Sequence, residues 1–468
     1  MKLAILGGGG FRVPLVFGAL LRDLADLGDL GVLGGRRVET VVLHDTDEAR
    51  LVAISQVLAQ QAERAGAQRH PGSSRSAPQV LTTTSLDAAL EGADFVFSAM
   101  RVGGLEGRTV DERVALDLGL LGQETTGAGG VTYGLRTVPV ALRVAERVRT
   151  VAPEAWVINF TNPAGMVTQA MQSVLGERVV GICDSPLGLA NRAAGALGHR
   201  LDDLQIDYAG LNHLGWLQGL RSGTTDLLPD LLADAAALGS IEEGRLFGVE
   251  WLQTLRTLPN EYLFYYYFTR DAIGQITTEA QTRGEYLVDQ QASFYAAVGS
   301  SPAQALAHWD TVRRERNATY MQETRREQAH DHERSEADIE GGGYEGVALA
   351  LMAAIARDEP ARLILNVRNG TTLPGLPADA VVEVPCRVTA SGPQPLPVSP
   401  LPGHALGLAQ QVKAVDELVI AAAADRSPTL AVEALALHPL VDSVTTAREI
   451  LQRCRARVPS LDAVFVRP

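Results

Sequence analysis

The sequence predicts an α/β fold, in which a doubly wound and mostly parallel sheet is followed by a mixed α+β domain that covers the carboxyl edge of the sheet. Over roughly the first 200 residues, short apolar runs alternate with amphipathic stretches, which is the rhythm of repeated strand–helix units. From about residue 230 onward the pattern becomes mostly helical. We therefore expect one domain over residues 1–200 and a second over 201–468.

The individual elements follow from these apolar periodicities. Strands are expected at 2–6, 39–44, 79–83, 93–98, 155–160, 178–183, 205–211 and 381–385. Helices are expected at 12–26, 47–65, 132–150, 282–297 and 345–357. The charge-rich stretch 313–340, with His330 and His332, is interpreted as a solvated helix or loop. Five prolines within 391–403 predict a rigid surface connection.

Composition limits the classes of partner and the compartment. The 468 residues include 41 basic and 55 acidic side chains, a net charge of −14, which argues against nucleic acid or an anionic membrane as the main partner. Three scattered cysteines fit a reducing compartment without a disulfide framework. The amino terminus lacks the pattern of a signal peptide, and no apolar run reaches the ~18 residues of a membrane span. We expect a cytoplasmic protein.

A glycine-rich loop at the end of the first strand indicates a dinucleotide site. Glycines let the backbone approach a pyrophosphate, whose charge the following helix start favours, although Arg12 or Val13 stands where the motif has its third glycine. Asp45 ends the second strand, where an acidic side chain binds a ribose hydroxyl and favours NAD over NADP. The insert Gly28–Arg37 explains the long interval before Asp45. The alternative interpretation is that this loop is a tight strand-to-helix turn that binds no ligand. We expect a Rossmann-like first domain that binds NAD through Gly7, Gly8, Gly9, Gly10, Phe11, Arg12 and Asp45.

Two further strand ends carry metal-binding side chains. Cys183 ends the run 178–183, and His213 follows the run 205–211. Each alone is more often a buried structural residue, but Asn162 and Asn212 stand at similar strand ends, where α/β sheets bind ligands. Two protein ligands leave positions open for substrate, and a thiolate favours a transition metal over Mg²⁺.

Other polar and aromatic residues extend this candidate site. A tyrosine cluster spans Tyr262–Tyr267; it is either core packing or a source of a base, since a nearby cation favours the phenolate. The polar, glycine-rich loop 122–130 suits a polyol. Arg101 and Arg283 are candidates for holding an anionic group, although each alone is an ordinary surface arginine.

Taken in order, these motifs resemble glycoside hydrolase family 4, the NAD- and divalent-metal-dependent glycosidases that depart from the usual two-carboxylate mechanism. The matching segments cover nearly the whole chain: 5–10, Arg101–Gly104, Gly122–Thr125, Asn159–Ala164, Ile182–Asp184, Gly210–His213, Leu258–Leu263, Val382–Pro385 and His438–Val441. The resemblance implies oxidation of the sugar at C3 by NAD, elimination across C1 and C2, addition of water and re-reduction at C3.

The resemblance also implies roles for single residues. Cys183 and His213 would bind the metal, usually manganese in this family. Tyr262 would be the base that removes the C2 proton, with Tyr265 as its rival. Asp184 matches the position that protonates the leaving group in α-cleaving members. The substrate would contact Arg101, Asn162 and Arg283.

The preferred substrate follows from the same resemblance. The segments Leu6–Pro14, Gly210–Trp216 and Leu258–Tyr267 are similar to the 6-phospho-β-glucosidase branch, and members are commonly homodimers or homotetramers. Asp184 instead favours a 6-phospho-α-glucosidase or an unphosphorylated α-glycosidase. Two other classes stay open: a lactate- or malate-type dehydrogenase, and an NAD-binding sensor without activity.

Overall fold

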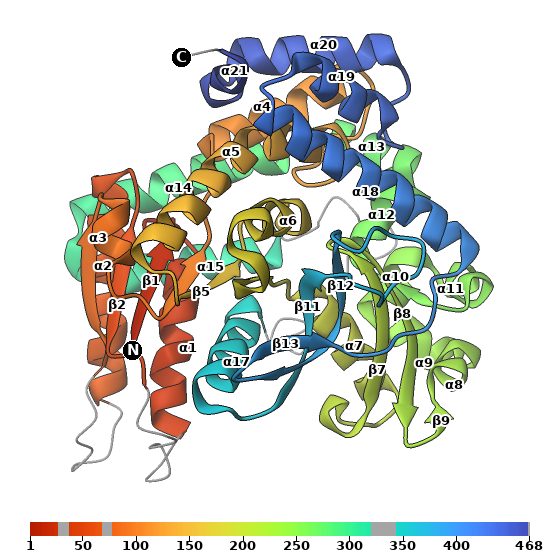
Figure 1. The fold of residues 1–468 in the computed structure, drawn as a ribbon, viewed down its shortest axis with the longest axis horizontal. Helices are drawn as coiled ribbons and strands as arrows, with labels where there is room; N and C mark the ends of the chain where they lie inside the picture. The colour runs from red at the N-terminus through yellow and green to blue at the C-terminus, as the bar shows by residue number, and fades with distance from the viewer. Residues whose placement is uncertain (27–36, 68–76, 320–342, 467–468) are drawn as a thin grey trace.

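The computed structural model describes residues 1–26, 37–67, 77–319 and 343–466. Its amino-terminal strands run parallel in the order β3-β2-β1-β4-β5-β6, the strand order of a doubly wound dinucleotide-binding sheet (Figure 1). The strands are β1 (Lys2–Leu6), β2 (Thr40–His44), β3 (Gln79–Thr83), β4 (Phe95–Ser98), β5 (Trp156–Asn159) and β6 (Val179–Gly181). The α/β fold class and these strands are confirmed.

Helices connect and cover these strands. A parallel sheet needs such crossovers and is buried on both faces, which is why β1 reads as a continuous apolar run and Leu3–Leu6 are buried. The helices are α1 (Val13–Asp26), α2 (Glu48–Ala67), α3 (Leu86–Leu90), α4 (Gly104–Asp117), α5 (Ala128–Val151), α6 (Ala164–Leu175) and α7 (Ser185–Ala196). The predicted helices at 12–26, 47–65 and 132–150 are thereby confirmed.

The second half of the chain extends the same sheet. β11 pairs antiparallel with β6, and the order then continues β12-β7-β8-β10, with β13 on β12 and β9 on β8. The strands are β7 (Gln205–Leu211), β8 (Leu214–Ser222), β9 (Thr225–Asp226), β10 (Leu258–Pro259), β11 (Ala361–Arg368), β12 (Val381–Thr389) and β13 (Gly392–Pro395). Cys183 follows β6 and His213 follows β7, so β11 and β12 lie between the two strands that carry the expected metal ligands.

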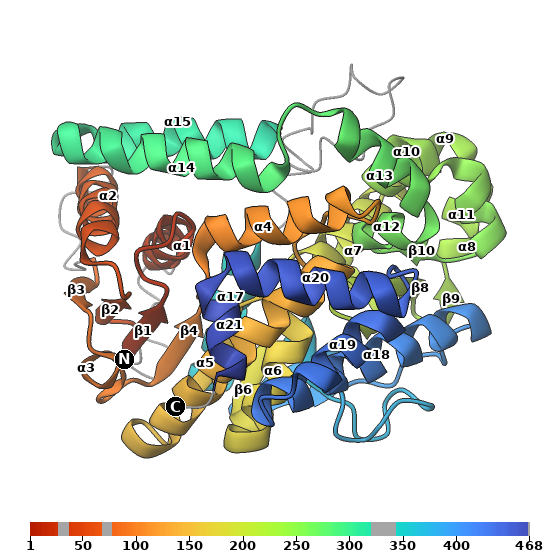
Figure 2. The same cartoon turned by 90° about the horizontal axis from the view of Figure 1, so that it is seen from above.

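The remaining helices surround this mixed sheet. Two long antiparallel helices, α14 and α15, lie side by side and cross α2, and α18 to α21 pack on the opposite side against α4 and α5 (Figure 2). The helices are α8 (Leu228–Ala233), α9 (Ala235–Ser240), α10 (Glu242–Phe247), α11 (Val249–Leu255), α12 (Phe264–Tyr267), α13 (Thr269–Thr278), α14 (Arg283–Ser300), α15 (Ala305–Ala318), α17 (Tyr344–Arg357), α18 (Gly403–Ala424), α19 (Pro428–Leu437), α20 (Val444–Arg457) and α21 (Pro459–Phe465).

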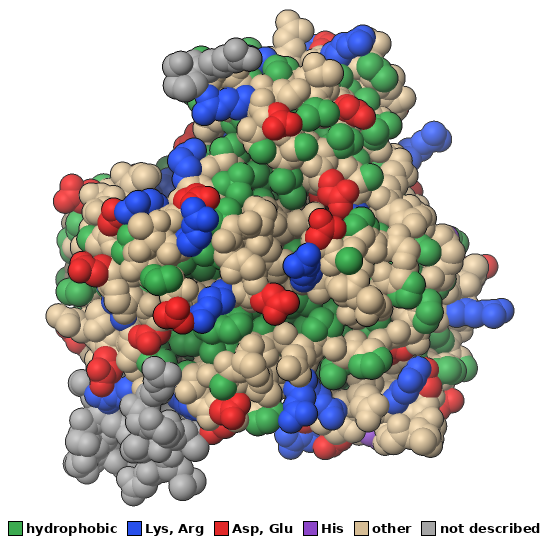
Figure 3. Space-filling model, viewed as in Figure 1, with side chains coloured by type: hydrophobic (Ala, Val, Ile, Leu, Met, Phe, Trp, Pro, Cys, Tyr) green, Lys and Arg blue, Asp and Glu red, His purple; other side chains and the backbone are tan. Residues whose placement is uncertain are grey.

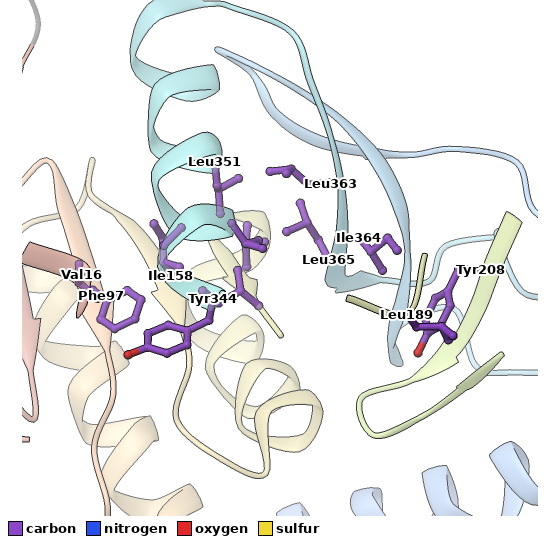
Figure 4. Close-up of a cluster of buried hydrophobic side chains, with 14 of the residues drawn as sticks. Val16, Phe97, Ile158, Leu189, Tyr208, Tyr344, Leu351, Leu363, Ile364 and Leu365 are labelled. Atoms are coloured by element: carbon purple, nitrogen blue, oxygen red, sulfur yellow. The ribbon is translucent and has the colours of Figure 1, made fainter. Parts of the chain in front are cut away.

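A continuous apolar core joins the two halves. Figure 4 shows Phe97 of β4 beside Tyr344 of α17, and Leu351 of the same helix near Leu363 of β11. Tyr344 also stacks on Phe160, with 4.0 Å between ring centroids. On the outside, acidic and basic side chains are interspersed over the face in Figure 3. Within the described residues, no helix is long and apolar enough to cross a membrane.

The proline-rich segment differs from its prediction. Gly392–Pro395 is strand β13, which pairs with the edge of β12. An edge strand tolerates prolines because some of its backbone N–H groups are not needed for pairing. His330 and His332, most of 313–340 and nearly all of the insert Gly28–Arg37 lie outside the described residues.

Candidate active site

The glycine loop is held tightly against the end of β2. The backbone N–H groups of Gly7 and Gly8 both donate to the His44 carbonyl, at 3.0 and 2.7 Å. Gly7 has φ 81°, and a Cβ there would lie 2.5 Å from the Ala99 carbonyl oxygen, so only glycine fits. The Gly9 N–H donates to Asp45 Oδ2 at 3.0 Å. The expected cofactor residues Gly7–Gly10 and Asp45 are thus brought together.

Residues from the second half of the chain cover the same loop. The Tyr295 hydroxyl donates to the Gly9 carbonyl at 2.6 Å, and the Trp309 indole donates to the Phe11 carbonyl at 2.9 Å. Phe11 itself is buried against Trp309, so it offers backbone atoms rather than its ring to a ligand. The Arg12 guanidinium lies over the rings of Phe160 and Tyr344, 5.4 Å from each centroid.

Cys183 lies two residues beyond β6 and is 6% exposed. Burial raises the pKa of its thiol well above the ordinary value, and the nearby carboxylates of Glu383 and Asp184 raise it further. Asp184 is half-buried and immediately precedes α7. A divalent cation at this point would offset the negative surroundings and favour the thiolate.

His213 occupies the tight turn between β7 and β8 with φ 62°, in the left-handed region. Its Nδ1 is hydrogen-bonded to the Thr125 hydroxyl at 3.0 Å, which leaves Nε2 as the ring nitrogen available to a cation. Burial lowers its pKa to about 4, outweighing the opposite effect of Glu124. The imidazole is therefore neutral near pH 7, as a metal ligand must be.

The Tyr262 ring stacks on His213, with 3.6 Å between centroids and 4° between planes. Tyr262 is half-buried in a short 3₁₀ turn (Glu261–Leu263), whose start is capped by Asn260. Glu261 accepts a hydrogen bond from Ser185 at 2.8 Å, which ties this turn to the segment of Cys183 and Asp184. The structure therefore brings the expected base to the expected metal ligand.

Of the other tyrosines in the cluster, Tyr265 is buried, whereas Tyr266 and Tyr267 are half-buried. Tyr265 is 1% exposed, with its ring edge-on to Phe264. The Tyr267 hydroxyl accepts a hydrogen bond from Trp216 at 2.9 Å. Of the two candidate bases, Tyr262 has the more accessible side chain and the contact with His213.

Arg101 is ion-paired with Glu124. Glu124 also accepts from Arg108 at 2.5 Å. The two guanidinium groups lower the pKa of the Glu124 carboxyl well below its usual range, although burial of the carboxyl acts in the opposite direction.

Asn162 precedes a cis peptide bond to Pro163, and its side-chain oxygen accepts a hydrogen bond from the Ala164 N–H at 3.3 Å. Both residues lie at carboxyl ends of neighbouring strands, Arg101 after β4 and Asn162 after β5.

Arg283 begins α14 and is held by α15. Its guanidinium donates to the Thr319 hydroxyl at 2.7 Å and to the Arg316 carbonyl at 3.2 Å. Arg316 was not predicted; its pKa is lowered far below the ordinary value by burial and by the charges of Arg12, Arg283, Arg101 and Arg108. The expected substrate residues Arg101 and Arg283 therefore belong to one cationic region, which suits an anionic ligand.

Comparison with known proteins gives the family. The model of the family 4 glycosyl hydrolases matches residues 2–199, and the model of their C-terminal domain matches residues 208–441. The chain belongs to glycosyl hydrolase family 4. It is a family 4 glycosidase, and the predicted resemblance is confirmed.

Named relatives of this glycosidase include enzymes for both anomers. A probable 6-phospho-β-glucosidase of Bacillus subtilis is 32% identical, with 78% of each chain covered. A maltose-6'-phosphate glucosidase of the same organism is 30% identical, covering 79% of this chain and 80% of that one. The solved 6-phospho-β-glucosidase of Thermotoga maritima with manganese, NAD⁺ and glucose-6-phosphate is 26% identical, with a TM-score of 0.76 and 98% of both chains covered.

Several residues of the site escaped the sequence prediction. Glu124 and Thr125 lie in the loop that was expected to bind a polyol, yet they contact Arg101 and His213. Glu383 was seen only as part of a strand, although a carboxylate among Val382, Val384 and Pro385 is an unusual core residue. This charged residue in an apolar strand was the feature of the sequence from which a role for Glu383 could have been suspected.

Proposed function

We propose that this family 4 glycosidase hydrolyses 6-phospho-β-glucosides with bound NAD and a divalent metal ion, manganese by preference. The observation that carries the proposal is the stack of Tyr262 on the half-buried, neutral His213. It joins a candidate base to a candidate metal ligand at the carboxyl edge of a dinucleotide-type sheet. The ligands in the Thermotoga structure, manganese, NAD⁺ and glucose-6-phosphate, support the same assignment.

The residues of the site fit these groups. A neutral imidazole and a thiol among carboxylates form a donor set for a transition metal, held by His213 and Cys183. Gly7–Gly10 and Asp45 form the cradle for NAD, where an added Cβ at Gly7 would clash with the backbone. When bound, NAD exchanges a hydride with the sugar and the cation polarises its oxygens, which acidifies the neighbouring C–H bond.

The chain itself then handles protons and orientation. Tyr262 removes the proton from C2 of the sugar as the bond from C1 to the leaving oxygen breaks, and Asp184 supplies a proton to that oxygen. Arg101, Asn162 and Arg283 hold the sugar and its phosphate in the cationic region.

The α-anomer is the second candidate, because Asp184 matches the acid of α-cleaving members and the B. subtilis maltose-6'-phosphate glucosidase is 30% identical. A dehydrogenase of the lactate or malate type would pair its histidine with a carboxylate. His213 is instead hydrogen-bonded to a hydroxyl. We also propose a homodimer or homotetramer, which light scattering would test.

The deciding experiment is turnover of p-nitrophenyl-β-glucoside 6-phosphate with NAD⁺ and Mn²⁺ under reducing conditions. The α-anomer and the unphosphorylated sugars are run in parallel. We expect turnover of the β-phosphate alone, lost when NAD⁺ or Mn²⁺ is omitted, without net formation of NADH. Turnover of the α-phosphate alone would transfer the assignment to the second candidate. Oxidation of a 2-hydroxy acid with net formation of NADH would refute the proposed hydrolytic reaction and favour a dehydrogenase. NAD binding without turnover of any substrate would favour a sensor.

A further inference from the structure

A row of paired residues crosses the four strands between the two expected metal ligands. Gly181 of β6 pairs with Asn366 of β11, Asn366 pairs with Glu383 of β12, and Glu383 pairs with Gly210 of β7. Cys183 follows Gly181 by two residues, and His213 follows Gly210 by three. The row therefore lies directly behind both ligands.

Glu383 is the centre of this row and is fully buried. Its Oε1 accepts hydrogen bonds from Asn366 Nδ2 at 2.8 Å and from Asn212 Nδ2 at 3.1 Å. Its Oε2 accepts one from the Tyr208 hydroxyl at 3.2 Å. A buried carboxyl group is costly unless hydrogen bonds replace its water, and these three donors do so.

On the β7 side, this network fixes the turn that presents His213. The turn consists of Asn212 and His213, because Leu211 pairs with Leu214. A histidine at φ 62° is held in a region that side chains seldom adopt, so the turn needs support from its surroundings. The bond from Asn212 to Glu383 supplies that support one residue before the ligand.

On the β6 side, the network packs directly on the backbone that leads to Cys183. A Cβ at Gly181 would lie 2.7 Å from the Cβ of Asn366, so these two residues are in close contact. The side-chain amides of Asn366 and Asn212 both donate hydrogen bonds to the same oxygen, Glu383 Oε1. One atom therefore connects the approaches to both ligands.

We propose that Glu383 is a positioning residue, which sets the place of the His213 turn relative to the end of β6 and thereby the geometry of the metal site. This inference rests on the proposed roles of Cys183 and His213. Partners that orient metal ligands typically change metal affinity by roughly 10- to 100-fold when removed. Glu383 does not contact the expected ligand His213 directly; it acts on the His213 turn through its hydrogen bond with Asn212.

The test is the affinity of the purified full-length protein for Mn²⁺, measured by electron paramagnetic resonance of the free ion without substrate. Glu383→Ala should raise the Kd for Mn²⁺ at least about tenfold and leave the Kd for NAD⁺ within about twofold. Glu383→Gln should stay within about threefold of the wild type, because its amide oxygen accepts from both asparagines and its NH₂ group donates to Tyr208. Unchanged Mn²⁺ affinity in Glu383→Ala would overturn the inference. So would equal losses in both variants, which would indicate charge rather than position.

Two further variants separate positioning from general damage. Tyr208→Phe removes the hydroxyl that donates to Oε2. It leaves both asparagine bonds to Oε1 in place, so the Mn²⁺ affinity should stay within about twofold. If it weakens binding as much as Glu383→Ala, the effect is structural and the inference fails. If Glu383→Ala does not fold, Asn212→Ala replaces it and should weaken Mn²⁺ binding several-fold; unchanged binding would refute positioning. Failure of the wild type to bind Mn²⁺ would instead refute the proposed metal site.

Discussion

The rings of His213 and Tyr262 lie face to face, with their centroids 3.6 Å apart and their planes 4° from parallel. The two residues come from different parts of the chain, a turn after β7 and a 3₁₀ turn after β10. The stack fixes the direction of the Tyr262 hydroxyl relative to the imidazole. A cation on His213 would thus stand close to the phenol and favour its ionised form.

We predict that Tyr262→Phe keeps the stack and loses the base. Turnover should fall by about 10²- to 10⁴-fold, the usual contribution of a general base, and exchange of the sugar C2 proton with deuterated water should stop. Binding of NAD⁺ and Mn²⁺ should not change. Exchange is measured by proton nuclear magnetic resonance of the substrate.

Tyr265→Phe is the matched control for this prediction. Tyr265 is buried and should lose no more than a modest part of the activity. The opposite pattern, with exchange kept in Tyr262→Phe and lost in Tyr265→Phe, would make Tyr265 the base.

Substitution of the Cys183 thiol should weaken metal binding and leave NAD⁺ binding unchanged. In Cys183→Ser we expect the Kd for Mn²⁺ to rise at least about tenfold, because a hydroxyl is a much poorer ligand than a thiolate. Turnover should fall with it, while NAD⁺ binding, measured by calorimetry, stays constant. Cys454→Ser in α20 is the control, since that thiol is also buried but lies on a helix that packs against α4 and α19. Equal Mn²⁺ affinity in both variants would remove Cys183 from the site.

A methyl group at Gly9 should weaken NAD⁺ binding. Its Cβ would lie 2.7 Å from the Cβ of Arg50 and 3.1 Å from Asp45 Oδ2, which disturbs the contact between loop and carboxylate. We expect Gly9→Ala to raise the Kd for NAD⁺ about tenfold, equivalent to about 1.4 kcal/mol. Gly66→Ala in α2 is the matched control, because no atom lies within 4 Å of its added Cβ. Equal affinities in the two variants would contradict the placement of NAD at this loop.

The sequence was sufficient to predict those elements whose structure is determined by a local pattern of residues. Apolar runs identified β1 to β7. The inner parallel strands such as β1, β4 and β6 are continuous apolar segments because both faces of the sheet are covered. Strand ends located Cys183 and His213. The sequence was insufficient to predict which segments far apart in the chain lie next to each other in the fold. The pairing of β11 and β12 between β6 and β7 depends on contacts across about 180 residues, which no periodicity encodes.

The same limit applies to the site. Thr125 and Glu383 act only through residues far away in the chain, so their roles emerge from the fold. Tyr262 and Tyr265 are three positions apart in one aromatic cluster, and composition could not separate them. Their burial and the His213 stack distinguish them. The division into domains at residue 200 stays a prediction.

The buried Glu383 carboxyl should make stability depend on pH in a defined direction. Burial raises its pKa to about 7, against the opposing hydrogen bonds from Asn212, Asn366 and Tyr208. In the unfolded chain its pKa is about 4.3. Below that pH the carboxyl is protonated in both states. As the pH rises toward 7, the unfolded state releases its proton first, so the free energy of unfolding falls; above 7 the loss is complete, on the order of 3 kcal/mol.

Glu383→Gln removes this one titration and leaves all others in place. We therefore predict that the stability of the variant relative to the wild type increases as the pH is raised from 4.5 to 7.5. Urea unfolding in the presence of a chelator measures the difference at each pH, and groups such as His213 titrate in both proteins and cancel. Parallel stability profiles would contradict the raised pKa. A difference that grows toward low pH instead would mean that the folded protein holds Glu383 ionised, with the three donors outweighing its burial.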